Sequence, residues 1–248
     1  MEVAFLIPST TRGLNINSIL DTPLYKAVLK TNPETRVKYF IGFDHDDPIY
    51  SRKRQRKKLN ASYNIEWVPQ HVEKGHVTQI WNNLAEVAIK QGHEYMYVLG
   101  DDIYFETQKK YLMTWEYILQ KRNNIGWCAG FSGNDRIATQ FFIHKSHYEI
   151  FGWIYPPLIK NWFCDDWLHH IYNKCHTTWM SDFKHLNVGG EPRYIPNKEQ
   201  ISMLVPLLKR YKNQIQKYIS KNKNITISKD ASAKYSSASK DEDIRPDS

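Results

Sequence analysis

Short apolar segments alternate with amphipathic ones through the first half of the chain. Each apolar segment has the length of a buried strand and is followed by polar residues, and the segments cover residues 3–7, 37–43, 65–69 and 95–99. Apolar residues recur at helical spacing over residues 20–29 and 77–91, and Gly92 is suited to end the second helix. Strands that alternate with helices predict an α/β fold with three layers and a mainly parallel central sheet.

The pattern becomes less regular in the second half. A helix is predicted at 109–120, two strands at 126–131 and 137–143, and a helix start near 165. Two strands joined by a short turn indicate that the sheet gains an antiparallel portion. Residues 182–194 are polar and contain glycine, residues 198–223 predict one or two basic helices interrupted at Pro206, and 226–248 have the composition of a disordered tail.

Composition limits the class of protein. The chain has 248 residues and 41% hydrophobic content, enough for one large domain or two closely packed small ones. Its three cysteines include no CxxC pair, which argues against a disulfide framework or a structural zinc site and favours a reducing compartment. Residues 1–13 lack a basic region and a long apolar run, so we expect no signal peptide. No segment reaches membrane-spanning length, and we therefore expect a cytoplasmic protein.

The net charge is +8, and much of the excess lies in residues 52–58 and 209–223. Such runs are usually solvated surface, and a basic surface also suits an enzyme whose substrate carries a diphosphate. No zinc-finger, RNP-type or basic-zipper pattern is present in the sequence, so we expect no specific nucleic-acid binding. A non-catalytic protein that binds a polyanion through 52–58, read as a loop, remains an alternative.

Acidic residues follow the apolar segment at 95–99. Gly100 is followed at once by Asp101 and Asp102, and adjacent carboxylates at the carboxyl end of a strand are well placed to hold a hard divalent cation against a phosphate. An Asp-rich turn is the alternative. The first apolar segment is followed by a loop, residues 8–13, whose hydroxyls, backbone N–H groups and Arg12 suit a nucleotide or phosphate.

A second pair of acids, Asp165 and Asp166, lies between Trp162 and Trp167. Tryptophans beside carboxylates are typical of sites that grip sugars, because the ring stacks on the sugar while the acids bind hydroxyls. Helix capping accounts for one of the two acids as an alternative. A metal pair between Asp166 and one of the histidines at 169 and 170 has suitable helical spacing, although histidines that merely cover a helix face are the simpler interpretation.

The polar stretch at 182–194 also contains candidate ligands. Its Gly189–Gly190 pair would let the backbone approach a ligand closely, while His185 and Arg193 could meet a metal and a phosphate respectively. A single histidine is more often a packed or surface residue.

Four motifs occur in an order typical of one enzyme family: VAFLIPSTTRG, YFIGFD, VLGDDIYF and CDDW. Over residues 3–194 the chain resembles a GT-A type glycosyltransferase, and it is similar to the small nucleotide-sugar transferases encoded by large DNA viruses. The family usually has an Asp-x-Asp motif, whereas Gly100 stands here in place of the first acid. This departure leaves the number of metal ligands open.

The resemblance implies a Rossmann-like GT-A domain over 1–195, with a nucleotide-binding half at about 1–105 and an acceptor half at about 106–195. The C-terminal basic helices (196–225) and the tail (226–248) follow it. The implied activity is transfer of a sugar from a nucleoside-diphosphate sugar, with UDP favoured, to a hydroxyl of a glycan or glycoprotein. The transferred sugar is a hexose or a pentose, and inversion is favoured. A nucleotidyltransferase of related fold is an alternative, and oligomeric state is left open.

The resemblance also assigns roles to individual residues. Mn²⁺ or Mg²⁺ would be held by Asp102, Asp101 and His185. The nucleotide sugar would be bound by Pro8, Thr10, Arg12, Asp44, Asp101 and Arg193. Asp166, or else Asp165, would deprotonate the acceptor hydroxyl, and Trp162 and Trp167 would bind the acceptor. If the protein is viral, its location would be the host cytoplasm.

Overall fold

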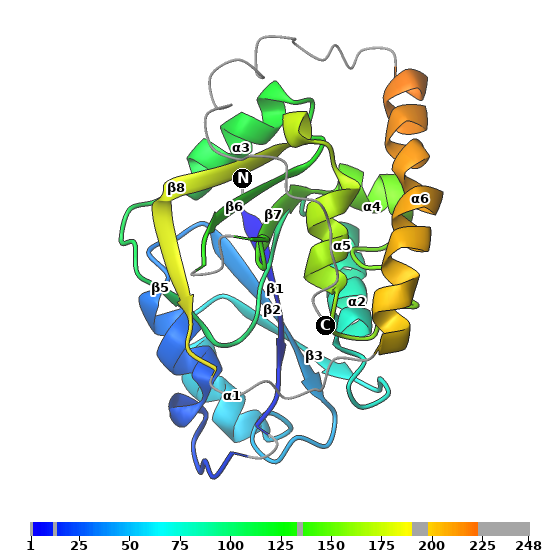
Figure 1. Cartoon of the computed structure of the whole chain (residues 1–248). Helices are drawn as coiled ribbons and strands as arrows, with labels where there is room; N and C mark the ends of the chain where they lie inside the picture. The colour runs from blue at the N-terminus through cyan, green and yellow to red at the C-terminus, as the bar shows by residue number, and fades with distance from the viewer. Residues whose placement is uncertain (1, 12–13, 133–135, 190–197, 223–248) are drawn as a thin grey trace.

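The computed structural model describes residues 2–11, 14–132, 136–189 and 198–222. Eight strands form one mixed sheet in the order β3-β2-β1-β4-β7-β6-β8-β5 (Figure 1). The strands are β1 (Val3–Ser9), β2 (Val37–Asp44), β3 (Ile65–Gln70), β4 (Tyr95–Val98), β5 (Ile103–Phe105), β6 (Trp127–Phe131), β7 (Phe141–His144) and β8 (Thr177–Asn187).

The sheet is mainly parallel, as the sequence predicts. Strand β1 pairs in parallel with β2 and β4, β2 pairs in parallel with β3, and β6 pairs in parallel with β8. The antiparallel pairs are β4–β7, β6–β7 and β5–β8, so the antiparallel portion lies in the second half of the chain. The parallel first half brings the carboxyl ends of β1, β2 and β4 to one edge of the sheet.

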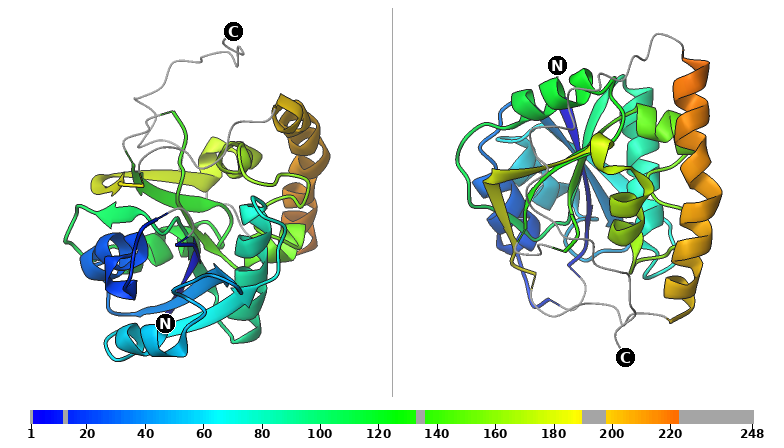
Figure 2. Two further views of the ribbon diagram at one scale, coloured as in Figure 1. Left: turned by 90° about the horizontal axis from the view of Figure 1, so that it is seen from below. Right: turned by 45° about the horizontal axis from the view of Figure 1, so that its top comes forward.

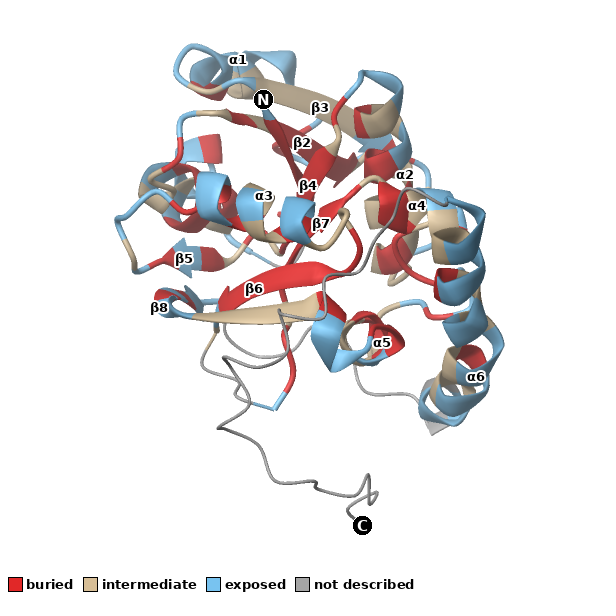
Figure 3. Ribbon diagram, turned by 90° about the horizontal axis from the view of Figure 1, so that it is seen from above, coloured by how far each residue is buried: buried red, intermediate tan, exposed pale blue. Residues whose placement is uncertain are grey.

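Helices cover both faces of the sheet and give three layers. One face packs against η2, α1 and α3, and the other against α2, α4, α5 and α6. Figure 3 shows the central strands buried, β3 and β8 mainly of intermediate burial or exposed, and the outer sides of the helices exposed. The helices are η1 (Ile19–Asp21), η2 (Leu24–Leu29), α1 (Lys53–Asn60), α2 (Val77–Lys90), α3 (Leu112–Lys121), α4 (Ser146–Phe151), α5 (Cys164–Ile171), η3 (Lys174–His176) and α6 (Lys198–Lys221).

Strand alternation explains why β1 is buried on both sides. Phe5 and Ile7 belong to the core under η2 and α3, whereas Ala4 and Leu6 face the core under α2. Gly42 in β2 permits close packing of α2, because a Cβ there would overlap the side chain of Ile80. Helix α2 therefore packs directly against the sheet.

The C-terminal basic segment is one continuous helix, α6, with Pro206 inside it. The helix lies along the outside of α4 and α5 (Figure 2). Tyr211 packs edge-on against Trp153 at 5.2 Å between ring centroids, and the Tyr218 hydroxyl donates to Glu149 Oε2 at 2.6 Å. None of the described helices combines the length and apolarity that a membrane crossing requires.

Several segments differ from the sequence-based prediction, and β5 and α4 were not predicted at all. The basic run read as a loop forms helix α1, and the stretch read as a polar loop from 182 onward contains the second half of strand β8. In β8 the buried Phe183 and His185 alternate with the exposed Asp182 and Lys184, which is the period of two of a strand. The sequence did not indicate this strand because a histidine stands at one of the two buried positions. The predicted disordered tail at 226–248 lies outside the described residues.

Candidate active site

The candidate site lies where β1, β2 and β4 end. These strands are parallel neighbours, so the residues that follow them meet at one edge of the sheet. The three segments are 9–11, 44–47 and 100–102. Sequence and structure therefore agree on which strand ends carry the polar residues.

Asp101 is held in a buried hydrogen-bond network. The Ser9 hydroxyl donates to Asp101 Oδ2 at 2.7 Å, and the Ser9 and Tyr50 hydroxyl oxygens are hydrogen-bonded at 2.8 Å. Burial, and then the charge of Asp101, raises the pKa of Tyr50 well above its ordinary value. Asp101 is only 4% exposed, so the network fixes its orientation. Ser9 belongs to the loop whose hydroxyls were predicted to suit a nucleotide, but its bond to Asp101 was not predicted, and neither was Tyr50, because an isolated Tyr carries no sequence signal.

Asp47 organises the loop beside Asp101. Its carboxylate is fully buried and accepts hydrogen bonds from the backbone N–H and hydroxyl of Thr11, both at 2.7 Å, and from the N–H groups of Ile49 and Tyr50 at 2.9 Å. The Thr10 hydroxyl also donates to it at 3.4 Å. The sequence-based prediction named Asp44 from this acidic stretch and missed Asp47, although an Asp before Pro48 is a turn signal.

Asp102 occupies a space that two glycines leave open. A Cβ on Gly100 would lie 2.7 Å from Asp102 Oδ1, and a Cβ on Gly189 would overlap Oδ2. The Val188 N–H donates to the Asp102 carbonyl at 2.9 Å, which places the end of β8 against the carboxylate. A side chain at position 100 would therefore require the Asp102 carboxylate to shift from the position it occupies here.

The structure encloses His185 away from solvent. Its Nε2 is hydrogen-bonded to Gln140 Oε1 at 2.6 Å, and since that oxygen only accepts, Nε2 carries the proton. Its Nδ1 has no hydrogen-bond partner among the described residues and lies against Gly130. Burial lowers the pKa of His185 to about 4, so the ring is neutral.

A divalent cation fits Asp102 better than it fits His185. The Asp102 carboxylate is partly exposed and supplies the oxygen that hard cations prefer, in a cradle that a Cβ would fill. His185 is fully buried, its Nε2 bonds Gln140, and its remaining ring nitrogen, Nδ1, lies against Gly130 away from solvent. Within the described ranges no cluster of three or more His, Cys, Asp or Glu side chains is arranged for a metal. A bound cation would thus need ligands from the substrate as well.

The second acid pair lies in the first turn of α5, as the sequence predicts. The Asp166 N–H donates to Asp165 Oδ1 at 3.1 Å. Burial, and then the neighbouring Asp166 carboxylate, raises the pKa of Asp165 to about 7. Burial, together with the neighbouring Asp166 carboxylate, therefore lets Asp165 retain a proton near neutral pH.

The two tryptophans around this pair differ in exposure. Trp162 is half-buried, whereas Trp167 is fully buried and packs against Phe151 and Trp153, with ring centroids 5.3 and 5.0 Å away. Trp167 is a core residue, so its ring face is closed to an acceptor in this structure. His169 Nδ1 accepts the Ala138 N–H at 3.1 Å, so the lone pair of that nitrogen is used within the fold.

Two of the remaining predicted residues lie at the strand ends that form the site. Pro8 lies buried in β1 opposite Gly42, and Asp44 ends β2, half-buried and in register with Gln70. Arg12 and Arg193, the two arginines predicted to bind the donor, lie outside the described residues.

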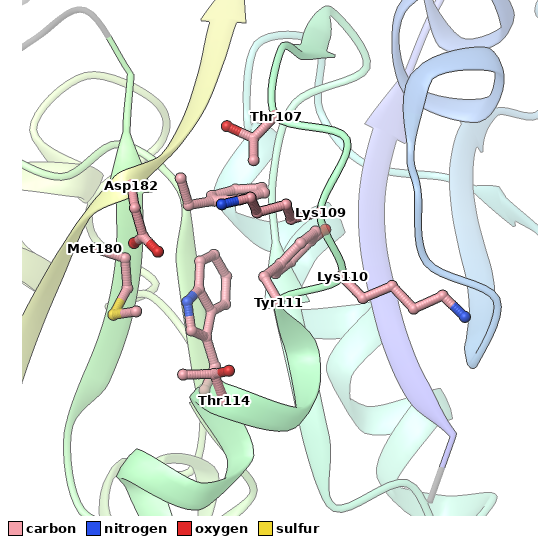
Figure 4. A pocket seen from close by; sticks show the side chains of 9 residues that line it. Thr107, Lys109, Lys110, Tyr111, Thr114, Met180 and Asp182 are labelled. Atoms are coloured by element: carbon pink, nitrogen blue, oxygen red, sulfur yellow. The ribbon is translucent and has the colours of Figure 1, made fainter.

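A small cavity of about 70 Å³ lies between the start of α3 and β8. Figure 4 shows Asp182 and Met180 on the β8 side and Lys109, Tyr111 and Thr114 on the other, with the Lys110 side chain pointing away. None of the predicted site residues lines this cavity, so it is separate from the acids at the strand ends.

The fold is shared with solved structures, although no family model and no curated protein matches the sequence. The structure of S. aureus TarS 1–349 in complex with UDP matches with a TM-score of 0.57 at 11% identity, over 85% of this chain and 65% of that chain. The complex of TarS 1–349 with UDP-GlcNAc gives 0.58 at 11% identity, over 85% and 66%. A longer TarS structure gives 0.55 at 11% identity, over 90% of this chain and 43% of that chain. The chain is therefore similar in fold to TarS, and it spans two thirds or less of the structures it matches.

Proposed function

We propose that this chain is a metal-dependent glycosyltransferase that moves a sugar from a nucleoside-diphosphate sugar, with UDP favoured, to a hydroxyl of a glycan or glycoprotein. One observation carries the proposal: a partly exposed carboxylate, Asp102, lies in a glycine cradle where parallel strands end. The fold similarity to TarS, solved with UDP and with UDP-GlcNAc, supports the same class of donor.

On the donor side, Asp102 would hold Mn²⁺ or Mg²⁺, with Asp101 behind it. The bound cation would supply positive charge that stabilises the leaving nucleoside diphosphate. Asp101 is fixed by Ser9, so its role would be to keep the end of β4 in place and to offer its second oxygen to the ribose or the metal. His185 is left out of this ligand set. Pro8, Thr10, Asp44, Arg12 and Arg193 remain candidate contacts to the nucleotide.

On the acceptor side, Asp165 and Asp166 would act as the base. The acceptor oxygen attacks the anomeric carbon, its proton passes to a carboxylate, and the bond from that carbon to the diphosphate oxygen breaks. A base with a pKa near the working pH is most effective, and the pKa of about 7 at Asp165 meets this requirement. The sequence narrowly favours Asp166 as the base, whereas the raised pKa of Asp165 favours Asp165. Trp162 would contact the acceptor.

Turnover by two variants tests the proposal. With UDP-GlcNAc and Mn²⁺ as probes, Asp102→Asn should lower donor hydrolysis by about 10²–10³-fold, because the charge that holds the cation is removed. Asp21→Asn is the matched control: Asp21 makes only an exposed ion pair with Lys26 at 3.3 Å, so its loss should leave the rate unchanged. If Asp102→Asn turned over at the wild-type rate with its fold intact, the proposed mechanism would be wrong.

A further inference from the structure

Helix α2 makes a side-chain hydrogen bond to the strands of the donor side. The Trp81 indole Nε1–H is shared between the carbonyls of Leu6, at 3.2 Å, and Leu99, at 3.3 Å. Leu6 belongs to β1 and Leu99 directly follows β4, and the pairing of these strands ends at Leu6 and Val98. The indole therefore lies where the ladder stops, three residues before Ser9 and two before Asp101.

The same helix holds the segment that leads to the acceptor acids. The buried Asn82 side chain accepts the N–H groups of Ile154 and Tyr155 and donates to the Tyr155 carbonyl, each at 2.9 Å. One turn earlier, the Thr78 N–H donates to the Lys160 carbonyl at 3.2 Å, and its hydroxyl donates to the Ile159 carbonyl. Segment 154–160 is thus tied to α2 at both ends just before α5.

The contacts of α2 with the strands and its contacts with segment 154–160 meet where the rings of Trp81 and Tyr155 touch. Trp81 packs edge-on against Tyr155 with 5.3 Å between ring centroids. Tyr155 is buried close to Asp165, whose charge contributes to the raised pKa of the tyrosine after burial itself. Helices α2 and α5 also cover the same face of the sheet (Figure 1). Contacts therefore run from Leu99 through Trp81 to Tyr155, and the charge of Asp165 acts on the Tyr155 hydroxyl.

We propose that the first turns of α2 form a brace that fixes the separation between the donor acids, Asp101 and Asp102, and the acceptor acids, Asp165 and Asp166. Trp81 is the positioning residue for the donor side, and Asn82 is the positioning residue for the acceptor side. The inference rests on the proposed function, since only a two-substrate reaction gives this separation a role. Transfer requires the reacting atoms to approach within about 3–3.5 Å, and a misplacement of about 1 Å can cost about 10²-fold in rate.

Two single variants separate the two arms of the brace. Trp81→Phe keeps a ring beside Tyr155 but removes the N–H that caps the strands. Asn82→Ala removes all three bonds to Ile154 and Tyr155 and leaves Trp81 in place. Matched controls are Trp67→Phe, which loses an exposed indole hydrogen bond to Asn60 Oδ1, and Asn83→Ala, whose amide donates to Gln70 Oε1 instead.

Amide hydrogen exchange of the full-length variants measures how firmly each segment is held, without any substrate. Trp81→Phe should raise amide exchange in 97–102 by about tenfold and leave 154–160 unchanged, and Asn82→Ala should do the reverse, because each change removes the ties of one segment only. The controls should alter neither segment.

Kinetics with UDP-GlcNAc and Mn²⁺ give the second readout. Trp81→Phe should raise KM for the donor by about tenfold with an unchanged pH profile of kcat. Asn82→Ala should leave KM unchanged, lower kcat by about tenfold, and move the acid limb of the profile to lower pH, because a loosened segment lets water reach Asp165. A uniform rise in exchange in both segments, or identical kinetic changes in both variants, would overturn the brace. Segment-specific exchange in a protein whose wild type shows no turnover would uphold the brace and refute the proposed function.

Discussion

At the residue scale, Asp165 retains a proton near neutral pH beside Asp166, and the ionised form of the pair costs stability. Burial and the charge of Asp166 raise the pKa of Asp165 from 3.8 to about 7, so the folded protein binds this proton more tightly than the unfolded chain does. The stabilising effect of that proton is complete below the unfolded pKa and is lost as pH rises through the folded pKa. The ionised pair therefore destabilises the fold at alkaline pH.

Asp165→Asn should remove this penalty. We expect the variant to be more stable than wild type at about pH 8 and to gain less at about pH 5, because the amide has no charge to desolvate. Urea unfolding at both pH values measures the difference. Asp21→Asn, at a solvent-exposed acid, should show no such pH dependence. An equal loss of stability at both pH values would mean that the Asp165 carboxylate is held by bonds that an amide cannot replace.

At the element scale, α1 is a basic helix that adds little to the core. Leu59 is its buried residue, and Gln55 ties it to the Asn17 carbonyl at 3.3 Å. Lys53, Arg54 and Lys57 are exposed. The helix is the feature that best supports the alternative of a polyanion-binding protein, so its contribution can be tested apart from the acids.

Neutralising the exposed face of α1 should leave catalysis intact. The triple change of Lys53, Arg54 and Lys57 to Gln should alter the free energy of unfolding by no more than about 0.5 kcal/mol, as surface substitutions usually do. UDP-GlcNAc turnover should be unchanged, while retention on a heparin column should weaken. If turnover were lost with the fold intact, α1 would belong to the substrate site.

The elements also show where sequence patterns suffice. Strands β1, β2, β3 and β4 and helix α2 carry clear periods of apolar residues, and the structure confirms all of them with bounds close to those predicted. Strand β5 has only three residues and follows the acids directly, so it reads as part of a turn. Strand β5 pairs with β8, whose residues lie some eighty positions further along the chain. Local periodicity cannot predict so distant a pairing.

At the scale of the whole molecule, residue type alone could not separate site from core. Trp167 lies beside two acids and His185 lies in a polar segment, but both are completely buried and serve packing or internal hydrogen bonds. Conversely, Ser9, Asp47 and Trp81 become important only because the topology brings β1, β4 and α2 together. The sequence could name the acids, but only the fold shows what orients them.

On the proposed function, Asp102 holds a cation that binds a nucleoside diphosphate. Isothermal titration of UDP into the protein, with Mn²⁺ and then with EDTA, tests this binding. We expect at least about tenfold tighter binding with Mn²⁺ for wild type and Asp21→Asn, and loss of that difference in Asp102→Asn. Equal UDP affinity with Mn²⁺ and with EDTA, or an undiminished Mn²⁺ effect in Asp102→Asn, would contradict it.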